Sequence, residues 1–339
     1  MKNNFSKFQF IGLILAAILF YIIPASAFDL QSASSLNADA KDINKLNEAQ
    51  KVETILNDLE LHWNEHNIDK VLNLYADDFI NGDGLELKAV KNLTTDLWDA
   101  YPDVMTSSVE RDIRIYGDYA TVTSTDIYKG TSKDIREEVG TKGTLLAIAT
   151  GEVFLKKYGP VWKITSDKTL VEKVSIGYGI GEEIIQENKI KLSAPEQIPS
   201  KTIYTTRLEF DIRADIKPVA SISKELLIYP QIPSEDKFRL IDSNNLERIF
   251  TANSISKNEL ITSTIGLTGG PLQPKLLGLV FLSQRVNVIP VSDKTDEISI
   301  IKEPARSALN HNKNKTDVLQ NNKNGKPDTE KINDDGVNN

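Results

Sequence analysis

The spacing of apolar residues changes along this chain, and that change constrains its fold more than any other feature. From Ile43 to Trp63 apolar residues recur at every third or fourth position, the period of a helix with one buried face. Two further helices are predicted within 71–79 and 87–98. After Val104 the period becomes two, which predicts antiparallel strands. Helices followed by such a sheet indicate an α+β domain, to which we assign residues 43–175.

The chain after this domain has a different character. Residues 176–200 contain three glycines and two prolines and are expected to be a linker. In residues 201–305 the helical period nearly vanishes, apart from one short helix predicted at 246–252. Prolines and polar turns separate the remaining apolar segments, so an all-β, sandwich-like domain is expected there. The strands of this domain are predicted at 203–212, 219–222, 226–229, 259–267 and 276–289.

Both ends of the chain are expected to lie outside these domains. Residues 1–27 combine two lysines, an apolar run and a small-residue site, which is typical of a signal peptide cleaved between Ala27 and Phe28. Export, with the bacterial periplasm as destination, follows from this prediction; an uncleaved membrane anchor is the alternative. Residues 28–42 are expected to form a flexible lead. Residues 306–339 hold nine asparagines and almost no large apolar side chain, so a disordered polar tail is predicted.

Composition excludes several functional classes. Removal of residues 1–27 leaves 38 basic against 48 acidic residues, a net charge of -10, which argues against a nucleic-acid partner. No later stretch is long and apolar enough to predict a membrane span. The chain has no cysteine, which excludes thiol chemistry and disulfides, and no phosphate-binding glycine loop is present. No cofactor is expected.

Three short segments carry a resemblance to a known fold. Residues 62–69 (HWNEHNID), 72–79 (LNLYADDF) and 159–164 (GPVWKI) resemble the nuclear-transport-factor-2-like superfamily, which includes SnoaL-like polyketide cyclases and ketosteroid isomerases. The likeness covers about residues 45–172. It implies a cone-shaped curved antiparallel sheet closed by three N-terminal helices around an apolar pocket, and a homodimer formed through that sheet. The region beyond is similar to C-terminal extensions of uncharacterised secreted bacterial proteins.

Asp83 is the candidate catalytic residue. Counted from residues 75–78, it falls where the resemblance places the general base of ketosteroid isomerases, so it could remove a proton next to a carbonyl. The positions of the family's two hydrogen-bond donors fall near Leu59 and Gly151, and neither side chain can donate. The alternative is that Asp83 shapes the turn at 81–84, as Asp and Gly commonly do.

The segment 62–66 contains a pattern found in zinc sites, but it is not expected to bind zinc. His62, Glu65 and His66 satisfy the pattern H-x-x-E-H, in which two histidines share one helix face. That chemistry needs a continuous helix and a third ligand, whereas the helix is expected to end near His66. No metal site is predicted.

Aromatic side chains supply the candidate ligand pocket. In the cone fold they would gather around the interior, where they either line a cavity for an apolar molecule or fill the core themselves. These residues are Trp63, Tyr75, Phe79, Trp98, Tyr101, Phe154 and Trp162.

The favoured function is non-catalytic binding in the periplasm, either of a small apolar ligand in the cone pocket or of a protein partner on a sheet face. One alternative is a lyase or isomerase of the polyketide-cyclase or ketosteroid-isomerase type with Asp83 as base. Another is a structural role in envelope assembly. The sequence leaves the ligand, the partner and the oligomeric state open.

Overall fold

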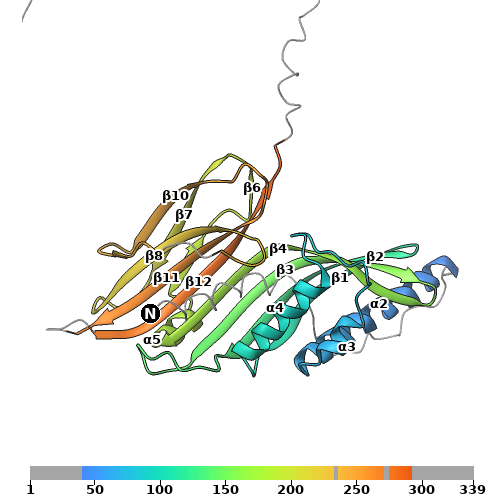
Figure 1. Cartoon of the computed structure of the whole chain (residues 1–339), viewed down its shortest axis with the longest axis horizontal. Helices are drawn as coiled ribbons and strands as arrows, with labels where there is room; N and C mark the ends of the chain where they lie inside the picture. Colours follow the sequence, from blue (N-terminus) through green and yellow to red (C-terminus); the bar gives the residue numbers. More distant parts are fainter. Residues whose placement is uncertain (1–39, 233–235, 271–274, 292–339) are drawn as a thin grey trace, which may run out of the picture. The chain divides into compact units, whose positions relative to one another are not determined.

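The computed structural model describes residues 40–232, 236–270 and 275–291 (Figure 1). All of them belong to one compact unit that extends to Val291. The predicted signal peptide, most of the flexible lead and the polar tail lie outside the described residues. Within the described part of the chain, no helix is both long and apolar enough to cross a membrane.

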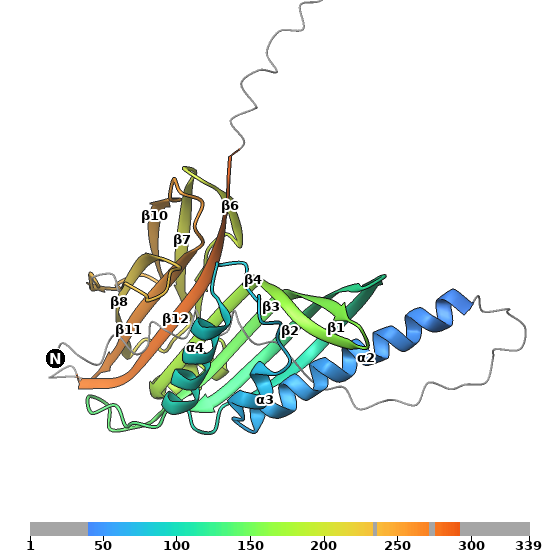
Figure 2. The same cartoon turned by 45° about the vertical axis from the view of Figure 1, so that its right-hand side comes forward.

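Three helices open the described chain: α2 (Ala40–Asn64), α3 (Ile68–Leu72) and α4 (Leu87–Ala100). The first and third agree with the predicted positions, and both pack on one hydrophobic core (Figures 1 and 2). The second is shorter than predicted. Beyond Leu72 the backbone bonds to a strand, because Ile164 donates to the carbonyl of Leu74 and Ala76 donates to the carbonyl of Ile164. These bonds replace further helical turns.

Four long strands follow and pair in sequence order as an antiparallel sheet. They are β1 (Met105–Tyr116), β2 (Tyr119–Thr131), β3 (Gly143–Tyr158) and β4 (Val161–Gly179). Burial alternates along β2 and β3, as the period-two pattern predicts. One face of the sheet therefore packs against the helices, and the other face is partly exposed. Three helices on a curved four-stranded sheet confirm the predicted α+β fold of this region.

The C-terminal strands continue the same sheet. β12 (Lys275–Ile289) pairs with β4, and β11 (Glu259–Gly269), β8 (Ile216–Leu226) and β9 (Arg239–Leu240) follow outward, so nine strands including β6 (Gln197–Pro199) form one sheet. A second sheet of three strands, with order β10-β7-β5, shares a core with this extension through side chains such as Leu208, Ile265 and Val280. Its strands are β5 (Ile190–Ser193), β7 (Ile203–Phe210) and β10 (Asn245–Thr251).

Three sequence-based expectations differ from the structure here. Of the segments expected as two strands, 219–222 lies within the single strand β8, whereas 227–229 follows the end of β8 at Leu226 and is not a strand. The stretch 176–200, expected as a linker, contains the end of β4, helix α5 (Ile180–Gln186), β5 and β6. Its glycines serve close packing, because a Cβ on Gly177 would collide with the backbone of Gly181, and one on Gly181 with the backbone of Leu279. The helix expected at 246–252 is strand β10, where pairing with β7 overrides a local helical spacing.

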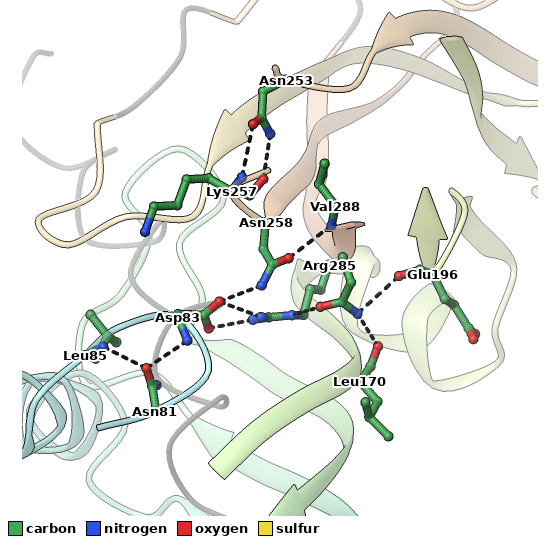
Figure 3. Close-up of polar contacts among 11 residues, drawn as sticks. Asn81, Asp83, Leu85, Leu170, Glu196, Asn253, Lys257, Asn258, Arg285 and Val288 are labelled. Carbon is green, nitrogen blue, oxygen red and sulfur yellow. Dashed lines mark hydrogen bonds and ion pairs between the residues drawn. The ribbon is translucent and has the colours of Figure 1, made fainter. Parts of the chain in front are cut away.

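A buried ion pair joins the two ends of this fold (Figure 3). Arg285 on β12 donates to both carboxylate oxygens of Asp83, at 2.6 and 3.0 Å, and the two side chains are 1% and 4% exposed. Asn258 donates to the same carboxylate at 2.7 Å. Asn287 accepts from Arg285 Nε and donates to the carbonyl of Leu170 on β4. These bonds hold the turn that follows α3 against Asn258 and strand β12, which lie more than 170 residues further along the chain.

We expect Asp83→Ala to lower the free energy of unfolding by about 3–5 kcal/mol, because it leaves the guanidinium of Arg285 buried without a counter-charge. Urea denaturation measures this change. Asp112→Ala is the matched control, since Asp112 pairs with Arg114 at an exposed site and its loss should change stability little. Equal stability of Asp83→Ala and the wild type would refute the structural importance of the pair.

Candidate functional site

The structure brings together six of the seven predicted lining residues. They are buried in the single core between the helices and the first four strands. Phe154 is the exception: it is half-buried, because its neighbours Val153 and Leu155 occupy the inward positions of β3. The six residues are Trp63, Tyr75, Phe79, Trp98, Tyr101 and Trp162.

Part of the interior is filled by aromatic rings in mutual contact. The ring centroids of Trp63 and Trp98 are 5.8 Å apart, and those of Trp63 and Tyr128 are 5.6 Å apart, both edge to face. The indole N–H groups of Trp63 and Trp98 have no acceptor among the described residues. Trp162, by contrast, donates to Glu48 at 2.8 Å. The interior therefore retains polar atoms without partners in the described chain.

The residues of the rejected zinc pattern lie at the end of α2. His62 Nδ1 is 3.1 Å from Glu65, and the ring of His66 stacks on Trp98 at 4.8 Å. His66 Nε2 contacts the carbonyl of Val104 at 3.2 Å. Because α2 ends at Asn64, the two histidines do not lie on one continuous helix.

Asp83, the predicted base, is held by three donated hydrogen bonds. Arg285 supplies two of them and Asn258 the third, as Figure 3 shows. The turn itself is shaped by Asn81, whose side-chain oxygen accepts from the backbone N–H groups of Asp83 and Leu85. A general base needs a lone pair directed at its substrate, and this carboxylate directs its oxygens at a guanidinium.

Two further acidic side chains, absent from the sequence-based set, lie on the inner face of the sheet. The strand register places Asp126 of β2 opposite Ala149 of β3, and Ala149 opposite Glu172 of β4. The two acids thus share one row across three strands, about 10 Å apart between Cα atoms. Between them β3 contributes only small side chains on this face, at Ala147 and Ala149. The row combines two carboxyl groups with a small-residue floor.

Asp126 is fully buried and hydrogen-bonded within the sheet. Ser108 donates to one carboxyl oxygen, and Ser124 donates to the other at 3.2 Å. Burial raises the pKa of Asp126 to about 7, although both serine hydrogen bonds and Arg111 act to lower it. Its neighbour Glu60 on α2 is also buried, and burial raises the pKa of that carboxyl to about 8.

Glu172 is the most isolated acid in the site. It is 0% exposed, and neither carboxyl oxygen has a hydrogen-bond partner within residues 40–232, 236–270 and 275–291. Burial raises the pKa of Glu172 to about 8; Arg285 lowers it and Asp83 raises it. A buried polar group without a partner is costly and is found where a protein has a use for it.

The sequence carries one signal for these acids. Asp126 lies at an inward position of the alternating pattern that also places Val122 and Tyr128 inward, and Glu172 shares its parity with Val174 and Ile176. An acid at a core position of a strand is unusual and could have been noticed. The pairing of the two acids could not, because it depends on the register between strands.

Of the known proteins compared, only solved structures match this chain. No protein-family model and no curated protein matches the sequence. Among solved structures, an NTF2-like protein with a cystatin-like fold from Novosphingobium aromaticivorans is 11% identical; the match covers 41% of this chain and 90% of that one, with a TM-score of 0.32. A hexachlorocyclohexane dehydrochlorinase from Novosphingobium barchaimii is 14% identical over 38% and 88%, with a TM-score of 0.31.

A third structure, Bd1075 of Bdellovibrio bacteriovorus, is 15% identical, with a TM-score of 0.30; the match covers 40% of this chain and 42% of that one, less than half of its length. The activities named for these proteins remain theirs. The helices α2 to α4 and the strands β1 to β4 stand in the order that the sequence resemblance implies. Residues 40–179 form the N-terminal α+β domain of the described chain.

Proposed function

We propose that this protein is an exported, non-catalytic binding protein that holds a small, largely apolar molecule inside its NTF2-like domain. The aromatic core supplies the apolar surroundings, and the row of Asp126 and Glu172 supplies polar anchoring. Export through residues 1–27, with cleavage after Ala27, is part of this proposal. The C-terminal strands, proposed as a sandwich-like extension, brace the domain through Arg285.

The state of Glu172 carries this proposal. A carboxyl group with no exposure and no partner among the described residues lowers the stability of the fold, and a ligand that donates a hydrogen bond to it would remove part of that cost. Ligand sites commonly combine an apolar lining with a few such polar groups. The enzymatic alternative with Asp83 as base has less support, because Arg285 and Asn258 already bind that carboxylate.

A homodimer through the outer face of the sheet is a second element of the proposal. On that face Ile127 of β2 lies opposite Ile148 of β3, and Ile148 is 42% exposed. The neighbouring pair, Thr125 and Thr150, forms a side-chain hydrogen bond at 2.9 Å. Lys173 of β4 lies opposite Ile148 on the same face, so this surface combines an apolar centre with a basic neighbour, and we propose that a second copy of the chain covers it.

Solvent extraction tests the binding function. The full-length chain, exported with its own N-terminal segment and purified from the envelope fraction, should release a small molecule that native mass spectrometry detects beforehand as added mass. Glu172→Leu should abolish most of this added mass, because it removes both carboxyl oxygens at a similar side-chain volume. Glu152→Leu, on the outer face of β3, is the control and should retain the molecule. A wild-type protein without added mass would contradict the proposal.

The raised pKa of Glu172 predicts a pH dependence of stability. The folded protein binds this proton more tightly than the unfolded chain, so the contribution of Glu172 to stability is greatest below about pH 4.5 and is lost as pH rises towards 8. Asp126 and Glu60 act in the same direction. Glu172→Gln should reduce the loss between pH 5 and 8 by a few kcal/mol, measured by urea denaturation. Parallel curves for variant and wild type would refute the assignment.

A further inference from the structure

Acidic side chains outnumber basic ones around the row of Asp126 and Glu172. The groups that influence one another's pKa here comprise five carboxyl groups and two guanidinium groups. Asp83 already neutralises Arg285, the cation that lowers the pKa of Glu172. The five carboxyl groups belong to Glu60, Asp83, Asp126, Asp167 and Glu172, and the guanidinium groups to Arg111 and Arg285.

Aromatic rings border the same space. Tyr128 lies two residues beyond Asp126 on the same face of β2, and its ring contacts Trp63. Burial, then the charge of Asp126 and, among weaker effects, the charge of Glu172 hold the pKa of Tyr128 well above its usual range, so both acids are close to this ring. Electron-rich ring faces beside carboxylates are the surroundings in which proteins bind ammonium groups.

We propose that the molecule held in the NTF2-like domain is cationic, an amine or quaternary ammonium with an apolar body, whose charged group lies between Asp126 and Glu172. This inference rests on the binding function proposed above and names its ligand class. The unpartnered carboxyl of Glu172 supplies the counter-charge, the aromatic ring of Tyr128 lies on the same face of the sheet, and β3 places only the small side chain of Ala149 between the two acids. A cation would stabilise the carboxylate forms of these two acids, whereas a neutral ligand would leave both protonated.

The proposal predicts that binding strengthens as pH rises. A cation favours the carboxylate form of Glu172 and Asp126, so affinity should increase between pH 6 and 8.5 as these groups lose their protons. The other groups that face the row are Glu60 from α2, Arg111 from β1, Asp167 from β4, and the pair of Asp83 and Arg285. Glu60 and Asp167 should strengthen the trend, since burial raises the pKa of both carboxyl groups.

Two probes of equal shape test the charge requirement: benzyltrimethylammonium and its neutral carbon analogue, neopentylbenzene. Titration calorimetry on the full chain, after removal of any bound molecule, should show at least tenfold tighter binding of the cation at pH 8. Glu172→Gln and Asp126→Asn should each weaken cation binding about tenfold. Glu152→Gln, on the outer face, should leave it unchanged and serves as the control.

Equal binding of both probes, or an extracted natural molecule without a basic group, would overturn the cationic ligand while the binding function stands. Failure of the cation to bind, or affinity that falls as pH rises, would overturn it as well. The absence of any extracted molecule would instead count against the binding function itself. Circular dichroism of each variant establishes that it is folded, so that a loss of affinity is not a loss of structure.

Discussion

A guanidinium can be buried only if a counter-charge and hydrogen-bond acceptors are buried with it, and this constraint organises much of the structure. Arg285, on the last strand described, is 1% exposed and takes both oxygens of Asp83 from the turn after α3. Together with the β4–β12 strand pairing, this ion pair holds the C-terminal strands to the N-terminal α+β domain. The guanidinium that lowers the pKa of Glu172 is already paired with Asp83. The isolation of Glu172 is thus a consequence of how the fold closes.

Local periodicity was sufficient to predict the first and third helices and the four strands of the N-terminal α+β domain, because each is formed from neighbours in the sequence. It failed where long-range contacts decide. Gly177 and Gly181 suggested a linker, yet they allow β4, α5 and β12 to approach closely. The segment 246–252 has helical spacing, but the edge of β7 offers it a complete set of strand hydrogen bonds.

In the candidate site, too, features set by the local sequence were predictable and features set by long-range contacts were not. The clustering of six aromatic residues was predictable, since amphipathic helices and alternating strands direct them to one core. The state of Asp83 was not, because its partner lies 202 residues further along the chain. The row of Asp126 and Glu172 depends on register across three strands, which no spacing in the sequence specifies. What makes the interior chemically distinctive therefore arises only on folding.

Titration of the Glu172 carboxyl group tests most directly whether this group lies in the interior without a hydrogen-bond partner or counter-charge. Carbon-13 NMR of the side-chain carboxyl, assigned by its absence in Glu172→Gln, would follow protonation from pH 3 to 10. We expect the midpoint of this titration near pH 8, because burial favours the neutral acid. A midpoint near 4.5, the value of a solvated glutamate, would show that the carboxyl group is solvated or paired and that Glu172 is not an unpartnered interior acid.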